Sequence, residues 1–309
     1  MRDLLGLIRA LRHTRPDVVI PYTTWPNIGI NLAARFVPNI VTVWGQRDIV
    51  SLKNGFFERM AWKRANAVIC NAEHEVGFLQ RVFGDTRKNI HVVYNGVQLP
   101  EPELSRSEWR SKLNIKECDA VVVMLANFRK EKGHELLLQA WRQVVKSAKS
   151  TPVLVLAGAH QQNYENIHQL ACQFDLESSV RFPGHVQDVS GLLRASDIGV
   201  LVSPAEGLPN AVLEYMAAGL PVSASDVAGI REALGAETAG VFDGASGADV
   251  AEKLLHWINS PEDAKRSGLC NMHRIAEKFL PERMCCEMEE IIQRTLFVRS
   301  DSSLSAEQC

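Results

Sequence analysis

Two carboxylates and a predicted helix start lie close together in the segment SPAEGLPNAVLEYMAAGLPVSASD at residues 203–226. Gly207 permits a turn, and Pro209 suits the first turn of a helix because that position needs no amide hydrogen. We therefore expect a helix to begin near Pro209, with Glu206 just before it and Glu214 within it. The unpaired amides and partial positive charge of that helix end favour an anion such as a diphosphate.

The two glutamates predict that hydroxyl groups are recognised beside that anion. A carboxylate repels phosphate, so Glu206 is better suited to accepting hydrogen bonds from hydroxyl groups. Glu214 could hold a ribose diol, as the acidic residue of nucleotide-binding folds does. The simpler interpretation of either glutamate alone is an ordinary loop before a helix, whose dipole favours a nearby carboxylate.

Two cations follow a second predicted strand, in MLANFRKEKGHELLLQAW at residues 124–141. Arg129 and Lys132 emerge where that strand ends. They could clamp a diphosphate, the arginine through two bonds and the lysine as a compact charge. A solvated basic loop is the other interpretation. In VRFPGHVQDV at 180–189, Gly184 could let the backbone approach a ligand, or could form a plain strand-to-helix turn.

Short apolar runs alternate with amphipathic segments along the whole chain, which predicts parallel sheets covered by helices on both faces. In the first half we expect strands at 17–22, 40–44, 67–71 and 90–94, and helices at 3–13, 28–36, 56–65 and 73–83. In the second half we expect strands at 120–126, 153–158, 180–184, 197–203, 220–225 and 240–242, with helices at 134–148, 163–174, 188–195 and 209–218. A turn near Gly229 and helices at 248–259, 261–279 and 282–297 complete the pattern.

The alternation restarts after a polar, proline-containing stretch at 100–107, which we interpret as a linker. The fold class is therefore α/β, with two Rossmann-like domains at 1–98 and 99–280. The first domain opens with a helix and has no glycine-rich turn before Asp17, so we expect it to be incomplete. The polar residues 298–309 predict a disordered tail. In such sheets, ligands bind outside the carboxyl ends of the strands.

Composition excludes several classes of protein. The chain has 309 residues, of which 46% are apolar and 23% charged, as in a soluble globular protein. Its net charge of -2 gives no reason to expect nucleic-acid binding, and its apolar runs are too short for a membrane span. The seven cysteines form no C-x-x-C pair, which argues against a zinc site or a disulfide framework and favours a reducing compartment. The D-x-D, G-x-x-x-x-G-K-[ST], G-x-G-x-x-G and G-x-S-x-G motifs are also missing, so no metal, ATPase or dehydrogenase site is predicted.

The string E-G-L-P-N-A-V-L-E-Y-M-A-A-G-L-P-V, which begins at Glu206, resembles the E-x-x-x-x-x-x-x-E signature of the retaining glycosyltransferases of family 4. Lys132 and the glycine after it match the end of that family's G-R-x-x-x-E-K-G segment, whereas Asn127 stands at the arginine position and Arg129 is expected to substitute. F-P-G-H-V-Q-D is similar to the family's F-x-G-x-x-x-D loop near the nucleotide base. V-W-G-Q-R-D-I at 43–49 resembles a loop that faces the donor sugar, with Trp44 where a histidine is frequent.

The resemblance implies a GT-B fold and a retaining transfer of sugar from a nucleotide-diphosphate sugar to an acceptor hydroxyl. It implies that Glu206 is the catalytic residue against the donor sugar and that no metal or cofactor takes part. The donor-binding residues it implies are Arg129, Lys132, Gly184, Gly207, Leu208, Asn210 and Glu214. It also implies that the helix at 281–297 returns to the first domain. Polysaccharide or glycolipid biosynthesis in the cytoplasm, at the inner membrane face, would be the setting, with a glycan or lipid-linked acceptor as partner.

Other functions are compatible with the same residues. A sugar-nucleotide epimerase of this fold would need further acid and base residues that the sequence does not identify. Two other possibilities need no such acid and base residues. One is a non-catalytic module that binds a nucleotide sugar, and the other is a chain that works with a partner chain supplying the missing half. The helix at 2–15, where four arginines accompany an apolar stripe, could contact a membrane surface peripherally. We favour its packing on the first sheet.

Overall fold

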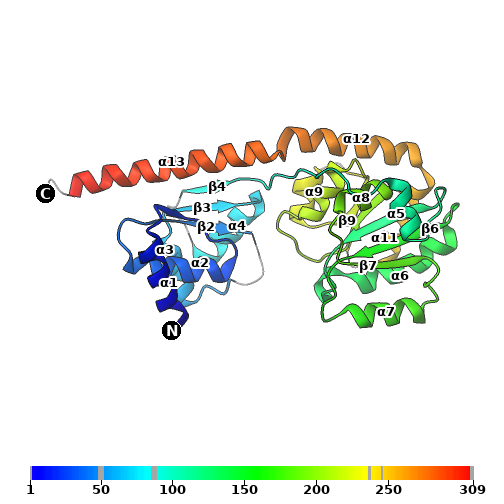
Figure 1. The fold of residues 1–309 in the computed structure, drawn as a ribbon, viewed down its shortest axis with the longest axis horizontal. Helices are drawn as coiled ribbons and strands as arrows, with labels where there is room; N and C mark the ends of the chain where they lie inside the picture. The colour runs from blue at the N-terminus through cyan, green and yellow to red at the C-terminus, as the bar shows by residue number, and fades with distance from the viewer. Residues whose placement is uncertain (1, 48–51, 85–88, 236–237, 245, 307–309) are drawn as a thin grey trace. The chain divides into compact units, whose positions relative to one another are not determined.

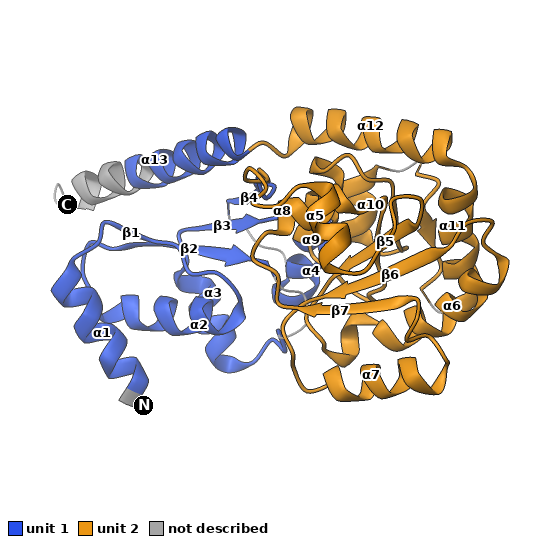
Figure 2. Cartoon of the chain, turned by 45° about the vertical axis from the view of Figure 1, so that its right-hand side comes forward, with its two compact units in different colours: residues 1–96, 281–309 blue, residues 97–280 orange. Residues whose placement is uncertain are grey.

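The computed structural model describes residues 2–47, 52–84, 89–235, 238–244 and 246–306. The chain divides into two compact units, unit 1 with Met1–Gly96 and Pro281–Cys309 and unit 2 with Val97–Leu280 (Figure 2). The first boundary lies two residues before the one expected from the sequence, and the second coincides with it. Every strand pair in the described residues is parallel, so the α/β class with two parallel-sheet domains is confirmed.

Unit 1 is built on a four-stranded sheet of order β1-β2-β3-β4 (Figure 1). The strands are β1 Val18–Val19, β2 Val41–Gln46, β3 Ala67–Cys70 and β4 Ile90–Val92; the helices are α1 Arg2–Thr14, α2 Thr24–Ala33, η1 Ala34–Phe36, α3 Phe56–Arg64 and α4 Glu73–Phe83. Because strand side chains alternate between faces, Trp44 and Val68 pack on α2, α3 and α4, whereas Val43 and Ile69 pack on the last helix, α13 Pro281–Ala306. The strand expected at 17–22 is only two residues long. It lies at the sheet edge, and Pro21 has no amide hydrogen to extend the ladder.

The first helix packs inside unit 1, as we favoured from the sequence. Ile8 and Leu11 are buried against Ala34 and Ile40, so the apolar stripe of α1 is used within the fold. Leu5, which is 53% exposed, is the exception. In the part of the chain that the structure describes, no helix combines the length and apolar character needed to cross a bilayer.

The last helix is longer than expected. α13 runs from Pro281 to Ala306, whereas the sequence predicted a helix ending at residue 297 followed by a disordered tail. The tail prediction is therefore wrong for residues 298–306, and residues 307–309 lie outside the described residues. No glycine or proline follows Pro281 before Ala306, so nothing in the local sequence stops the helix.

Unit 2 contains a six-stranded sheet of order β10-β9-β8-β5-β6-β7. The strands are β5 Ala120–Leu125, β6 Pro152–Ala157, β7 Val180–Gly184, β8 Ile198–Leu201, β9 Val222–Ser225 and β10 Val241–Phe242. Its helices include α6 His134–Ser147, α7 Tyr164–Gln173, α8 Val189–Ala195, α9 Asn210–Ala217, α11 Gly247–Asn259 and α12 Pro261–Lys278. The chain builds outward from β5 in one direction and from β8 in the other, so the strand order reverses between β5 and β8. Connections leave such a switch point in opposite directions and open a crevice at its carboxyl end.

Two helices of unit 2 were not predicted. α5, Arg106–Lys112, begins within the expected linker, where Ser105 and Glu108 form a capping box, a signal that the sequence does contain. α10, Ala228–Leu234, replaces the turn expected near Gly229. Gly229 lies inside this helix, where a Cβ atom would collide with the carbonyl oxygen of Gly207. A close approach between two segments, and not a turn, selects the glycine.

Candidate functional site

A cavity of about 450 Å³ lies at the carboxyl ends of the central strands of unit 2. Leu125, Ala157 and Leu201, which end β5, β6 and β8, line its floor. Of the residues that the sequence assigned to a site, four contribute to its wall: Lys132, Glu206, Asn210 and Glu214. These residues are up to 82 positions apart along the chain, and the switch point of the sheet brings them together.

An ion pair joins two of these residues across the cavity wall. The Lys132 ammonium donates to Oε1 of Glu206 at 2.6 Å, and the two side chains are 27% and 13% exposed. The position of Lys132 follows from the 3₁₀ turn Lys130–Lys132 and from Gly133, whose φ of +68° is a left-handed conformation that suits glycine. A Cβ atom at Gly133 would also collide with the carbonyl oxygen of Val202. The glycine thus lets this turn lie directly against the end of β8.

Helix α9 begins at the cavity. Pro209 is its N-cap residue and Asn210 is the first helical residue, so the helix begins one position later than expected. Asn210 lines the cavity, so the N-terminal end of α9 is beside the Lys132–Glu206 pair. Gly207 and Leu208 do not line it: the Gly207 carbonyl faces Gly229, and Leu208 is buried. These two residues shape the loop and do not form the cavity wall.

Glu214 lies one turn further along α9, partly buried at the cavity. Burial raises the pKa of its carboxyl group above the ordinary value. Among the residues that the structure describes, no side chain or amide donates to this carboxylate. Glu214 therefore presents acceptor oxygens that a ligand hydroxyl can satisfy.

Arg129 is not brought to the cavity. Its Nε donates to Oε1 of Gln161 at 2.7 Å, and the two residues line a separate hollow beside Asn163. The structure thus does not place Arg129 and Lys132 at one cavity, because the intervening 3₁₀ turn directs the two side chains to different places, and a donor-binding role for Arg129 stays a prediction. Asn127 lines the cavity instead, at the position where the sequence comparison placed the missing arginine.

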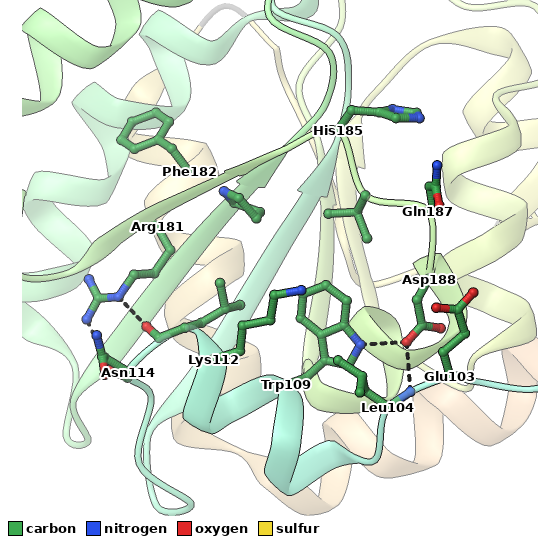
Figure 3. A pocket seen from close by; sticks show the side chains of 13 residues that line it. Glu103, Leu104, Trp109, Lys112, Asn114, Arg181, Phe182, His185, Gln187 and Asp188 are labelled. Atoms are coloured by element: carbon green, nitrogen blue, oxygen red, sulfur yellow. Dashed lines mark hydrogen bonds between the residues drawn. The ribbon is translucent and has the colours of Figure 1, made fainter.

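Gly184 ends β7 with a φ of +76°, and its carbonyl accepts from the Gly158 amide at 2.9 Å. It does not line the cavity, but the next two residues, His185 and Val186, do. Sequence analysis did not single out these two. They also line a second cavity of about 580 Å³ on the side of α5 (Figure 3). The His185–Val186 segment is therefore a wall shared by two cavities.

Asp188 fixes that wall. Its Oδ2 accepts from the indole N–H of Trp109 at 2.7 Å and from the Leu104 amide at 3.1 Å (Figure 3), while Oδ1 accepts from the Gly191 amide at 2.9 Å. Burial alone would raise the pKa of Asp188, but these hydrogen bonds, that of Trp109 first, hold it below its ordinary value. The carboxylate thus ties together the linker, α5 and the start of α8 behind the cavity wall.

The segment expected to face a donor sugar, at 43–49, belongs to unit 1. Trp44 is fully buried, and its indole N–H donates to Oε1 of Gln46 at 2.9 Å. Its ring packs edge-on against that of Trp62, with 5.4 Å between the ring centroids, so Trp44 is a core residue. Asp48 and Ile49 lie outside the described residues. Within the described part of the chain, no group of three or more His, Cys, Asp and Glu residues is placed to hold a metal ion.

Family models cover most of the chain. The family described as "Glycosyl transferases group 1" matches residues 105–268, and "Glycosyltransferase Family 4" matches residues 1–100. The UDP-Gal:alpha-D-GlcNAc-diphosphoundecaprenol alpha-1,3-galactosyltransferase of Escherichia coli is 27% identical, over 74% of this chain and 62% of its own length. The N-acetyl-alpha-D-glucosaminyl L-malate synthase of Bacillus anthracis is 26% identical, over 66% of this chain and 53% of its own. The chain thus spans less than two thirds of either relative.

Solved structures share the fold at low sequence identity. Alr3699/HepE of Anabaena, in complex with UDP and glucose, superposes with a TM-score of 0.83 at 18% identity, over 94% of this chain and 81% of that one. Sucrose-phosphate synthase of Thermosynechococcus elongatus gives a TM-score of 0.80 at 19% identity, over 96% and 78%. These similarities show that the two parallel-sheet domains form a GT-B fold.

Proposed function

Since this chain belongs to the group 1 glycosyl transferases, we propose that it moves a sugar from a nucleotide-diphosphate sugar to an acceptor hydroxyl, with retention at the anomeric carbon. The observation that carries the proposal is Glu214, a partly buried carboxylate at the cavity with no donor among the described residues. A ribose diol supplies two hydroxyl donors to such a carboxylate. The Lys132 ammonium and the start of α9 are at the same cavity and offer a place for the adjoining diphosphate.

The protein's main contribution to the reaction is to stabilise charge on the leaving group. As the bond between the anomeric carbon and the β-phosphate oxygen breaks, negative charge grows on the diphosphate. Lys132 and the amides that begin α9 are preorganised to meet that charge, which lowers the barrier without reorganising solvent. The proposed reaction needs no metal or cofactor.

Glu206 interacts with the donor sugar. Its carboxylate accepts hydrogen bonds from sugar hydroxyls and supports positive character at the anomeric carbon. Its pairing with Lys132 at 2.6 Å holds the carboxylate in one orientation before the donor arrives. The acceptor oxygen then forms its bond to the anomeric carbon, and its proton passes to the departing phosphate oxygen.

Relatives suggest the first donors and acceptors to test. The Escherichia coli relative is named for UDP-Gal and a diphosphoundecaprenol acceptor, and HepE was solved with UDP and glucose. We therefore propose UDP-hexoses as donors. For the acceptor we propose a glycan or a lipid-linked glycan at the inner face of the cytoplasmic membrane.

The direct test is release of UDP from UDP-Glc, UDP-Gal and UDP-GlcNAc, with and without acceptor glycans, and assignment of the product anomer by NMR. We expect turnover with one donor and an anomer that matches it. Glu206→Gln should abolish turnover but keep UDP binding, whereas Glu131→Gln, on the nearby 3₁₀ turn and outside the cavity, should turn over normally. UDP binding without turnover would instead indicate a non-catalytic module, and no binding would refute the proposal.

A further inference from the structure

The hydrogen-bond ladder between β5 and β8 stops before these strands end. The paired residues are Val122 with Ile198 and Val123 with Gly199, although both strands continue for two more residues. In a parallel ladder the bonds made by one strand to its neighbour recur every two residues. Counting on from Val123, the next bond would join the Leu125 amide to the Val200 carbonyl.

The Tyr215 hydroxyl of α9 occupies the place of that missing bond. Its oxygen accepts from the Leu125 N–H at 2.5 Å, and its O–H donates to the Val200 carbonyl at 3.2 Å. The side chain is completely buried, and burial raises the pKa of the phenol well above its ordinary value. The hydroxyl therefore keeps the proton that it donates. One oxygen atom thus satisfies both strand groups while keeping them further apart than a direct N–H···O=C bond would.

Room for the ring comes from a glycine. A Cβ atom at Gly199 would collide with the Tyr215 ring, so the ring lies directly against the backbone of β8. The residue before Tyr215 is Glu214, which lines the cavity. The hydroxyl bonds to Leu125 of β5 and to Val200 of β8, and the last residues of these two strands, Leu125 and Leu201, line the same cavity. The anchor and the candidate ligand group are thus adjacent on one helix.

We propose that Tyr215 is a positioning residue, whose hydroxyl holds the carboxyl ends of β5 and β8 apart and sets α9 at the depth that turns Glu214 into the cavity. The inference deepens the proposed function and rests on it for the identity of the ligand, a nucleoside diphosphate. The width of the crevice at the switch point then depends on a side chain that contacts no ligand.

The physical argument concerns what happens without the hydroxyl. A phenylalanine ring would leave the Leu125 N–H and the Val200 carbonyl buried and unpaired, which is unfavourable. The simplest way to satisfy both is a direct ladder bond, which draws the two strand ends together. Since both ends line the cavity, it would narrow from its present 450 Å³.

The test compares Tyr215→Phe with Ser179→Ala in the full chain. Ser179 is a matched control because its buried hydroxyl accepts from Trp141 Nε1 at 3.2 Å, donates to the Leu176 carbonyl at 3.2 Å and does not line the cavity. In a crystal structure of Tyr215→Phe we expect the Leu125 N and Val200 O atoms to close to about 2.9 Å, the usual hydrogen-bond length. Strand ends that stay apart with an unchanged cavity would overturn the inference.

Nucleotide affinity supplies the second measurement. Calorimetric titration with UDP, GDP and ADP should give about tenfold weaker binding for Tyr215→Phe, while Ser179→Ala, with a similar loss of thermal stability, binds like the wild type. Equal weakening in both variants would mean a general loss of stability and would overturn the positioning role. If the wild type binds none of the nucleotides, the proposed function fails, and the separation of Leu125 N and Val200 O in the variant still decides what the hydroxyl does.

Discussion

At the cavity, Glu206 and Glu214 carry the same chemical group in different surroundings. The Glu206 carboxylate is held by the Lys132 ammonium, whereas burial raises the pKa of Glu214, which has no donor among the described residues. Environments that differ in this way allow two carboxylates to take separate roles. In the proposed reaction, Glu206 supports the sugar at the reacting carbon and Glu214 holds the nucleoside.

The cavity wall predicts that the two basic residues selected from the sequence differ in importance. Lys132→Ala removes the cation beside the proposed diphosphate and leaves Glu206 to repel it, so UDP binding should weaken by about 10- to 100-fold. Arg129→Ala is the matched control, since its guanidinium bonds to Gln161 outside the cavity, and it should change the affinity less than about twofold. Calorimetry measures both. Equal losses would mean that Arg129 reaches the ligand.

The raised pKa of Glu214 predicts how UDP affinity depends on pH. Ribose hydroxyls donate to the ionised carboxylate, so binding releases a proton and the affinity should rise with pH through the Glu214 pKa, which burial raises from its ordinary value. Glu214→Gln should remove this part of the profile, and subtracting its curve cancels the titration of the diphosphate itself. An identical profile in both proteins would contradict the assignment.

Stability should depend on Glu214 with the opposite sign. Because the folded-state pKa is raised, the folded protein loses free energy of unfolding as pH rises through that pKa. At neutral pH, Glu214→Gln should therefore unfold at the same temperature as the wild type or higher. A lower unfolding temperature would indicate that the carboxylate has a structural partner.

Among the elements, the loop 203–208 and helices α9 and α10 form one assembly beside the switch point. The Gly207 carbonyl lies where a side chain at Gly229 would be, so α10 and the loop approach each other at backbone distance. Tyr215 ties α9 to β5 and β8 in the same region. The position of Glu206 thus depends on a contact with α10, a helix that lines no part of the cavity.

Gly229→Ala tests this dependence. The added methyl group would push the loop from α10, so the variant should lose about 1–3 kcal/mol of stability and bind UDP more weakly. Gly247→Ala is the control. Gly247 lies in the first turn of α11, and a Cβ atom there would make only an ordinary contact with Leu136. Thermal unfolding and calorimetry separate the two effects. UDP affinity that is unaffected by Gly229→Ala would show that the loop does not position the site.

Most elements could be predicted from the sequence because buried parallel strands are continuous apolar runs, as at 120–126 and 153–158. Where the structure departs from the prediction, the causes are local. The strand at 17–22 is short because Pro21 interrupts it at a sheet edge, and α5 was missed although Ser105 begins a capping box. At the site, Lys132 and Glu214 belong to motifs and were found. Asn127, His185 and Val186 were not, because only the strand order determines which loops meet at one cavity.

In the whole molecule, the chain passes between the units twice, at Gly96–Val97 and at Leu280–Pro281. The second passage lets α13 cover a face of the unit 1 sheet, where Ile291 is buried with Val43 and Ile69. Unit 1 therefore depends on a segment that follows unit 2 in the chain. All the residues that line the candidate cavity belong to unit 2.

Ile291→Asp tests whether the stability of unit 1 and the nucleotide binding of unit 2 are independent of each other. A carboxylate in that buried position should lower the stability of unit 1 by several kcal/mol and leave the UDP affinity of unit 2 within about twofold. Cys286→Asp, at an exposed position of the same helix, should change neither property. Differential scanning calorimetry with and without UDP would follow both units. Loss of UDP binding in Ile291→Asp would mean that the site needs unit 1.

The central claim is that the cavity at the switch point of unit 2 binds a nucleoside diphosphate through Glu214. Calorimetric titration of the wild type and of Glu214→Gln with UDP, GDP, ADP and their sugars tests it most directly. The account predicts one-site binding of one base series by the wild type and about tenfold weaker binding by the variant, which is about 1.4 kcal/mol. A folded wild type that binds none of these nucleotides, or a variant that binds them equally well, would contradict it.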